Sequence, residues 1–152
     1  MSERKFDDFD GFANDYRAIH SANVKLSGAD SFYFAEMKIA LLQRFEKNEK
    51  LELLDVGCGD GTTEIFIRQY FPAWRVNAID VSAESIKLAA EKNIPNTSFS
   101  LYDGINIPLK DNEVNLVFIA GVLHHVNFSL HNQLVKEIAR VLKPGGRLYL
   151  FE

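Results

Sequence analysis

The chain has little of several features that would assign its class at once. Only one of its 152 residues is a cysteine, Cys58, which excludes an internal disulfide and any zinc site built from several cysteines. No apolar run reaches the roughly 20 residues that a membrane-spanning helix requires, and the first residues hold no apolar segment of the signal-peptide type. We therefore expect a protein of a reducing compartment, most simply the cytoplasm, without membrane insertion.

Dense clusters of positive charge are also lacking. Lys and Arg total 17 and Asp and Glu total 21, so the formal net charge at pH 7 is −4. Because phosphate contacts dominate the affinity of proteins for nucleic acids, this balance argues against nucleic acid as a partner. Apolar residues make up 47% of the chain and charged residues 25%, which is ordinary for a globular protein. The length predicts one domain.

The chain alternates short apolar segments with amphipathic ones. We expect strands at 51–56, 74–80, 97–102, 114–120 and 147–151, and helices at 7–20, 31–46, 62–70, after a cap at Ser82, and from a cap at Ser129 to a stop at 143–146. Such alternation predicts βαβ units with right-handed crossovers, hence a doubly wound α/β fold with a mainly parallel sheet.

Two regions are expected along the chain. Residues 1–48 predict a helical N-terminal lead-in, and residues 49–152 predict the α/β core. The sequence stops at Glu152, within or just after the fifth strand, and proteins usually protect an edge strand. We therefore expect either a core truncated at its C-terminus or a partner over this edge, such as a second copy in a homodimer.

The segment 55–61, Asp-Val-Gly-Cys-Gly-Asp-Gly, is the clearest sign of a binding site. A strand leads into three glycines at alternate positions, and a helix follows. Glycine lets the backbone turn sharply and lets a ligand approach it closely. Open α/β sheets bind ligands at the carboxyl ends of their strands, which is where this loop lies.

Two kinds of cofactor bind to a glycine loop of this type, dinucleotides and S-adenosylmethionine. Asp80 follows Gly59 by 21 residues, a spacing that a dinucleotide site also shows. A dinucleotide loop, however, holds pyrophosphate against backbone N–H groups, and Asp55 and Asp60 would repel it. Thr62 also stands where the dinucleotide motif has its last glycine. S-adenosylmethionine has no phosphate, and its sulfonium and ammonium groups suit nearby acids, so an NAD-dependent oxidoreductase is the less favoured alternative.

Segment 55–61 resembles the first motif of the class I S-adenosylmethionine-dependent methyltransferases, within them the small-molecule group. Four further segments resemble later motifs of that family in the same order: 78–82, 101–104, 115–126 and 142–151. The resemblance covers about residues 50–152. It implies a Rossmann-like sheet of strand order 3-2-1-4-5, with two further strands after the fifth in typical members, and S-adenosylmethionine as cofactor with S-adenosylhomocysteine as product.

The resemblance also implies roles for single residues. Asp80 would hold both ribose hydroxyls, and Asp103 would lie near the adenine amino group; the alternatives are a helix-capping acid and a turn residue. Asn115 stands where many members have Asp, and we expect it to cap a strand. The complete predicted cofactor set is Tyr16, Asp55, Gly57, Cys58, Gly59, Asp80, Val81, Asp103, Gly104, Ala120 and Gly121.

Catalytic groups are harder to assign. His124 and His125 are candidates for a general base, because an imidazole titrates near neutrality; the alternative is a structural loop around the cofactor. We interpret Cys58 as a small spacer, since no basic activator is evident. Tyr16 with Arg17 is expected on the cofactor side, and the aromatic residues 32–34 either pack on the sheet or close over the cofactor. No metal site is expected.

Together these features predict an enzyme that transfers the methyl group of S-adenosylmethionine to an O, N or C atom of an unidentified small-molecule acceptor. The alternative from another class is a non-catalytic or truncated S-adenosylmethionine-binding module that needs a partner or further strands.

Overall fold

A computed structural model describes residues 31–152. The predicted helix at 7–20 and the predicted contacts of Tyr16 and Arg17 lie outside the described residues, as does most of the predicted lead-in. The first described element is helix α2, Ser31–Leu42, which ends four residues before the predicted 46. The helix stops there because the backbone tightens, with the N–H of Arg44 donating to the carbonyl of Leu41 at 3.1 Å.

The strands form one parallel sheet of order β3-β2-β1-β4-β5, which confirms the predicted order and direction. The strands are β1 Glu52–Val56, β2 Arg75–Asp80, β3 Thr97–Leu101, β4 Val114–Ala120 and β5 Leu142–Phe151. The remaining helices are α3 Thr62–Tyr70, α4 Ala83–Glu91, the 3₁₀ helix η1 Leu123–His125 and α5 Phe128–Val141. The chain builds outward from β1 to β3 and then returns to place β4 on the other side of β1, so the topological switch point lies between β1 and β4.

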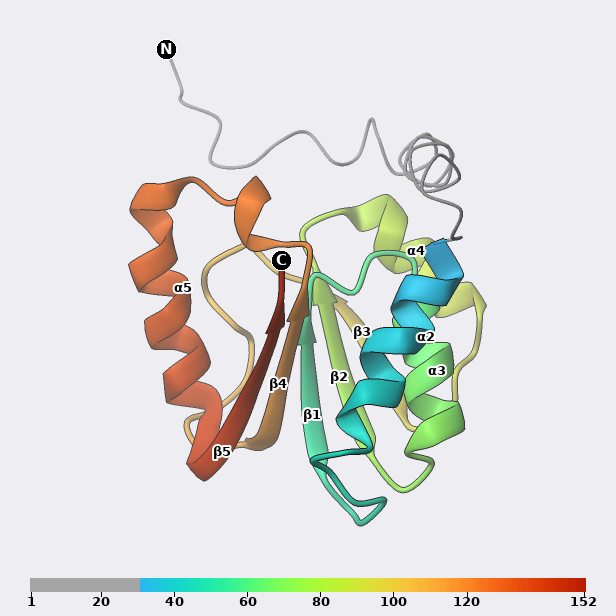
Figure 1. The fold of residues 1–152 in the computed structure, drawn as a ribbon. Coiled ribbons are helices and arrows are strands. Elements are labelled where there is room, and N and C mark those ends of the chain that lie inside the picture. Colours follow the sequence, from blue (N-terminus) through green and yellow to red (C-terminus); the bar gives the residue numbers. More distant parts are fainter. Residues whose placement is uncertain (1–30) are drawn as a thin grey trace.

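Helices cover both faces of the sheet (Figure 1). Successive residues of a strand point to opposite faces. Leu53 of β1 accordingly packs with Ile39 of α2 and Ile67 of α3, while Leu54 belongs to the cluster that contains Ile138 of α5. Because both faces are covered, the central strands are apolar throughout. None of the helices described in residues 31–152 is long and apolar enough to cross a membrane.

Two helix caps were predicted, and one is wrong. Ser82 caps α4 as expected, its hydroxyl accepting from the N–H of Ser85 at 3.1 Å. Helix α5, however, is capped by Asn127 rather than by the predicted Ser129. The Asn127 side-chain oxygen accepts from the Ser129 N–H at 3.0 Å, so the helix starts at Phe128. Asn is as good a cap as Ser, and it comes first along the chain.

The start of β5 also differs from prediction. Pairing with β4 begins at Leu142, not at Arg147, and the register shifts between Val114 and Leu116. The predicted turn at 143–146 is therefore an irregular stretch within the strand. Asn115 helps to hold it, because its side-chain oxygen accepts from the Lys143 ammonium at 3.1 Å and from the first N–H of β1, that of Glu52, at 3.0 Å. This last contact agrees with the predicted strand-capping role of Asn115.

Candidate cofactor and active site

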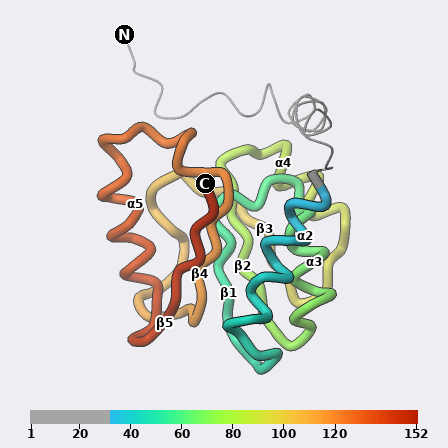
Figure 2. The backbone as a smooth tube through the Cα atoms, in the orientation of Figure 1, coloured from blue at the N-terminus to red at the C-terminus, as the bar shows by residue number. Residues whose placement is uncertain are grey.

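Most of the predicted site residues that the structure describes gather at the carboxyl edge of the sheet. The glycine loop follows β1, Asp80 ends β2, Asp103 follows β3 and Gly121 follows β4. The backbone trace shows that β5 also ends at this edge (Figure 2). Residues far apart in sequence are thus brought to the topological switch point, where open α/β sheets bind their ligands.

The glycine loop has two positions with different requirements. Gly57 and Gly59 both have positive φ, 80° and 56°, which disfavours side chains. A Cβ atom at Gly57 would lie 2.3 Å from Cγ2 of Val122, so this glycine is needed for packing. A Cβ atom at Gly59 would meet nothing within 4 Å. The backbone at Gly59 is therefore open to the close approach of a ligand.

Asp80 fastens this loop to β2. One carboxylate oxygen accepts from the Gly59 N–H at 2.8 Å, and the other accepts from the Ser82 N–H at 2.9 Å. The Gly57 N–H donates to the carbonyl of Ile79 at 2.8 Å. The helix-capping alternative for Asp80 is wrong, because Ser82 caps α4. Asp80 is thus an ionisable acceptor held beside the open backbone of Gly59.

Asp60 plays a different part from the one expected. Its carboxylate accepts from the Lys92 ammonium at 3.0 Å and from the N–H and hydroxyl of Thr62 at 3.2 and 2.8 Å. An acid at the start of α3 also suits the helix dipole. Because the charge of Lys92 balances that of Asp60, Asp60 would repel a phosphate ligand less strongly than the sequence indicated.

Asp55 lies beneath the loop with a second buried acid. Asp55 points to the same face of β1 as Leu53, toward α2 and α3. Asp55 is only 2% exposed and Glu64 is fully buried, and the side chains of these two acids are hydrogen-bonded to each other. Burial, with the charge of Asp80 adding to it, raises the pKa of Asp55 to about 6. Burial and the nearby Asp55 raise the pKa of Glu64 well above its ordinary value.

Lys38 of α2 reaches the same cluster. Burial lowers the pKa of Lys38, while the charges of Glu152 and Asp55 act in the opposite direction. Lys38 is therefore a half-buried cation close to the acids at this edge. Sequence reasoning missed Lys38 and Glu64, because their proximity to Asp55 arises only when α2 and α3 pack on the sheet.

Asp103 forms a turn at the start of the loop between β3 and β4. One carboxylate oxygen accepts from the N–H groups of Ile105 and Asn106 at 2.9 and 2.6 Å, as in an Asx turn. Gly104 has a φ of 87° within this turn. Asp103 therefore has the turn role, and its carboxylate lies at the carboxyl edge of the sheet. Its contact with adenine stays a prediction. The contact of Val81 with the cofactor also stays a prediction, and in the structure Val81 packs against the core.

The segment after β4 is organised by Glu152. One carboxylate oxygen accepts from the N–H groups of Val122 and Leu123 at 2.9 and 2.8 Å, and the other lies 2.8 Å from Nδ1 of His124. Burial opposes ionisation of Glu152, but these hydrogen bonds, led by that of His124, lower its pKa overall. Applying the carboxyl-edge rule to the fifth strand would have found this acid.

Three histidines and a cysteine lie on or next to these segments. The His124 side chain is 56% exposed, and its ring packs on that of His125 with centroids 3.9 Å apart. On α5, Nε2 of His131 donates to the carbonyls of Leu123 and Val126 at 3.0 and 2.9 Å, and these contacts hold η1 against the start of α5. Cys58 is buried, and burial with three nearby acids raises its thiol pKa. This agrees with a spacer and not with a nucleophile.

Comparison with known proteins identifies relatives. The ubiquinone/menaquinone biosynthesis C-methyltransferase UbiE of Pseudomonas paraeruginosa is 33% identical over 106 residues, covering 66% of this chain and 41% of that protein. A SAM-dependent methyltransferase structure from Aquifex aeolicus is 30% identical, with a TM-score of 0.61 over 70% of this chain and 58% of that one. A putative methyltransferase in complex with the Haloferax volcanii activator Trm112 is 25% identical, with a TM-score of 0.75 over 98% of this chain and 61% of that one.

These similarities extend over only part of each relative's length. The chain spans between 24% and 48% of the length of the first curated relatives that it matches. A family model described as a methyltransferase domain matches residues 54–150, from the middle of β1 almost to the end of β5, and so includes the glycine loop, Asp80, Asp103 and Gly121. This chain belongs to that methyltransferase family, whose cofactor is S-adenosylmethionine.

Proposed function

We propose that this chain binds S-adenosylmethionine at the carboxyl edge of its sheet and transfers the methyl group to a small-molecule acceptor. The observation that carries the proposal is the pairing of the Asp80 carboxylate with the open backbone of Gly59 at the switch point. Similarity to a C-methyltransferase of ubiquinone and menaquinone biosynthesis supports a carbon atom of a quinol-like molecule as the acceptor.

The chemistry of the donor set fits this cofactor. A carboxylate offers about four acceptor positions, so Asp80 suits two vicinal ribose hydroxyls in addition to the N–H groups that it holds. The Asp103 carboxylate, at the next strand end, suits an exocyclic amine. The open space at Gly59 admits a ligand against the backbone. The acids near Lys38, Asp55 and Glu152, suit cationic groups better than phosphates.

The residues of the chain mainly orient the reactants. The sulfonium of the bound cofactor supplies an activated methyl group, so positioning contributes most of the catalysis. We propose that His124 accepts the acceptor's proton at Nε2. Glu152 would act as a positioning residue, because Nδ1–H donated to its carboxylate leaves Nε2 as the basic nitrogen.

Calorimetric titration of the 152-residue chain with S-adenosylhomocysteine, with NADH as control, tests the cofactor. We expect micromolar binding of S-adenosylhomocysteine, weakened about 10- to 100-fold by Asp80→Ala, since hydrogen bonds to a charged group are lost. Glu49→Ala is the matched control, because this exposed acid lies in the loop before β1, at the edge of the sheet opposite the glycine loop. Its affinity should equal that of the wild type.

Each contrary result has a distinct meaning. Tighter binding of NADH would favour the oxidoreductase. A chain that is folded by circular dichroism and binds neither ligand contradicts the proposal. Binding of S-adenosylhomocysteine without methyl transfer to any quinol would instead favour a binding module.

A further inference from the structure

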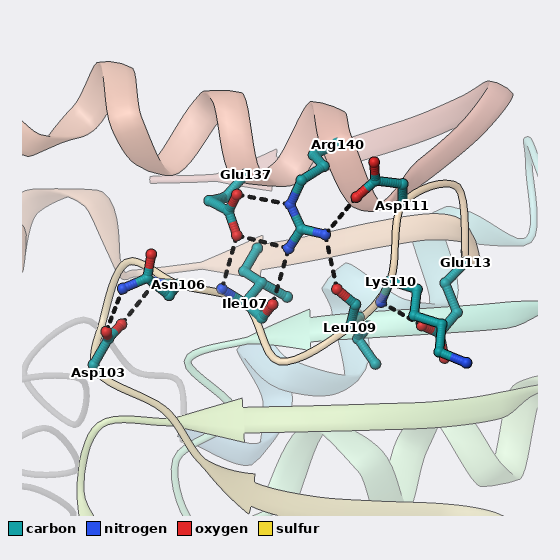
Figure 3. A network of polar contacts seen from close by, with 9 residues as sticks. All are labelled: Asp103, Asn106, Ile107, Leu109, Lys110, Asp111, Glu113, Glu137 and Arg140. Atoms are coloured by element: carbon teal, nitrogen blue, oxygen red, sulfur yellow. Dashed lines mark hydrogen bonds and ion pairs between the residues drawn. The ribbon is translucent and has the colours of Figure 1, made fainter.

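The loop between β3 and β4 is fastened to helix α5 by two charged side chains. Figure 3 shows the loop running beside the helix from Asp103 to Glu113, with Glu137 and Arg140 reaching across to it. A Glu137 carboxylate oxygen accepts from the Ile107 N–H at 3.1 Å. The Arg140 guanidinium donates to the carbonyls of Ile107 and Leu109 at 3.0 and 2.8 Å. Both polar groups of the Ile107 backbone are therefore held by α5.

The two side chains also hold each other. Nε and Nη2 of Arg140 donate to the two carboxylate oxygens of Glu137, each at 2.7 Å, and Nη1 donates to Asp111 at 2.9 Å. Hydrogen bonding to Arg140 lowers the pKa of Glu137. A bidentate guanidinium–carboxylate pair fixes both side chains in geometry as well as in charge. The pair is therefore a rigid support for the loop.

This support is connected to Asp103 through a short hydrogen-bonded unit. The Asp103 carboxylate accepts from the N–H groups of Ile105 and Asn106 and from the Asn106 side-chain amide. The next residue, Ile107, is the one that Glu137 and Arg140 hold, and its side chain is buried in the core cluster that includes α5. Movement of Ile107 would thus displace the turn that orients the Asp103 carboxylate.

We propose that Glu137 and Arg140 are positioning residues that set the selectivity of the site for adenine. The inference rests on the proposed function. An adenine ring offers an amino donor to the Asp103 carboxylate, whereas hypoxanthine presents a carbonyl oxygen at the same position, which offers no donor and repels the carboxylate. Sites that use a fixed hydrogen-bonding group reject an analogue lacking the partner more strongly than apolar sites do. A loosened loop loses that discrimination.

The test compares S-adenosylhomocysteine with S-inosylhomocysteine in calorimetric titrations of the 152-residue chain. We expect the wild type to prefer the adenine ligand at least about tenfold. In Glu137→Ala and Arg140→Met, the affinity for S-adenosylhomocysteine should fall about tenfold and the preference should shrink to about threefold or less. The change of preference is the informative readout, because general destabilisation weakens both ligands equally.

Arg68→Met is the matched control. Arg68 fastens another loop by the same kind of contacts, donating to the carbonyls of Pro72 and Trp74 at 2.6 and 2.7 Å. That loop precedes β2 and therefore lies at the opposite edge of the sheet. The base preference of this variant should equal that of the wild type.

Folding of each variant is checked by circular dichroism. If Glu137→Ala does not fold, Arg140→Lys decides, because lysine keeps the charge beside Glu137 but cannot hold both carbonyls. Full preference retained in the folded variants, or no preference in a wild type that binds S-adenosylhomocysteine, overturns the inference and leaves the proposed function standing. A folded wild type that binds neither ligand overturns the proposed function, and this inference with it.

Discussion

At the scale of single residues, the Glu152 carboxylate joins backbone structure to a candidate base. Its two oxygens have separate tasks, since one accepts from two backbone N–H groups and the other accepts from His124. Substitution by glutamine separates them, because an amide keeps one acceptor oxygen but has a donor in place of the other. The structural and the catalytic contributions of this side chain are therefore experimentally separable.

We predict that Glu152→Gln lowers kcat for methyl transfer to a quinol about 100-fold while leaving the affinity for S-adenosylhomocysteine within about twofold of the wild type. His124→Gln should have a similar effect, and the double variant should be no slower than either single one, because both act through one proton transfer. The measurement is transfer of a radiolabelled methyl group, with its pH profile. Unchanged kcat in Glu152→Gln would show that the carboxylate only organises η1.

Two other acids, Asp55 and Glu64, make the stability of the chain depend on pH. Both pKa values are raised in the folded state, that of Asp55 to about 6. An acid with a raised folded pKa binds more protons when folded than when unfolded. Its contribution to stability is therefore complete below the unfolded value of about 4 and is lost as the pH rises through the folded value.

We predict that Glu64→Gln raises the free energy of unfolding at pH 8 by roughly 1–3 kcal/mol relative to the wild type, with little difference at pH 4. Removing one of two adjacent buried acids relieves both burial and repulsion. Urea denaturation at several pH values measures the effect, with Glu84→Gln on α4 as the control substitution. An equal difference at pH 4 and pH 8 would contradict the coupling of the two acids.

At the scale of secondary-structure elements, the local sequence pattern predicted the bounds of an element correctly where only one sequence feature marked them. The apolar run at 114–120 was predicted as a strand and the segment at 62–70 as a helix, and the structure reproduces the bounds of both. Prediction failed where two signals were equivalent, as with Asn127 and Ser129, both good caps two residues apart. It also failed at Pro144, which suggested a turn; within the described residues β5 pairs only with β4, and an edge strand tolerates proline.

The candidate site divides in the same way. The glycine loop, Asp80 and Asp103 were predictable, because each marks the end of a strand and parallel strands end together. The Lys38 and Glu64 environment and the Glu137–Arg140 pair were not, because each depends on how a helix rotates and packs on the sheet. Sequence pattern locates strand ends better than it locates side chains that meet across elements.

At the scale of the whole molecule, the strand order sets a gradient of stability. Strands β1 and β4 lie between neighbours and are almost entirely buried, whereas β3 is partly exposed and, within residues 31–152, pairs only with β2. We predict that amide hydrogens of β3 exchange about 10- to 100-fold faster than those of β1 and β4. Hydrogen exchange measured by mass spectrometry or NMR would test this, and uniform protection across the sheet would contradict it.

Helix α5 has a consequence for the geometry of the reaction. Near its start, His131 holds the carbonyls of Leu123 and Val126 on either side of the candidate base, and near its end, Arg140 holds the loop that leads back to Asp103. Nine residues separate the two contacts, a span of about 14 Å along a helix. Under the proposed function, the helix is a spacer of fixed length between the loop proposed to select adenine and the segment proposed to accept the proton of the methyl acceptor. Inserting or deleting one residue in this span would change both the distance and the angle between them.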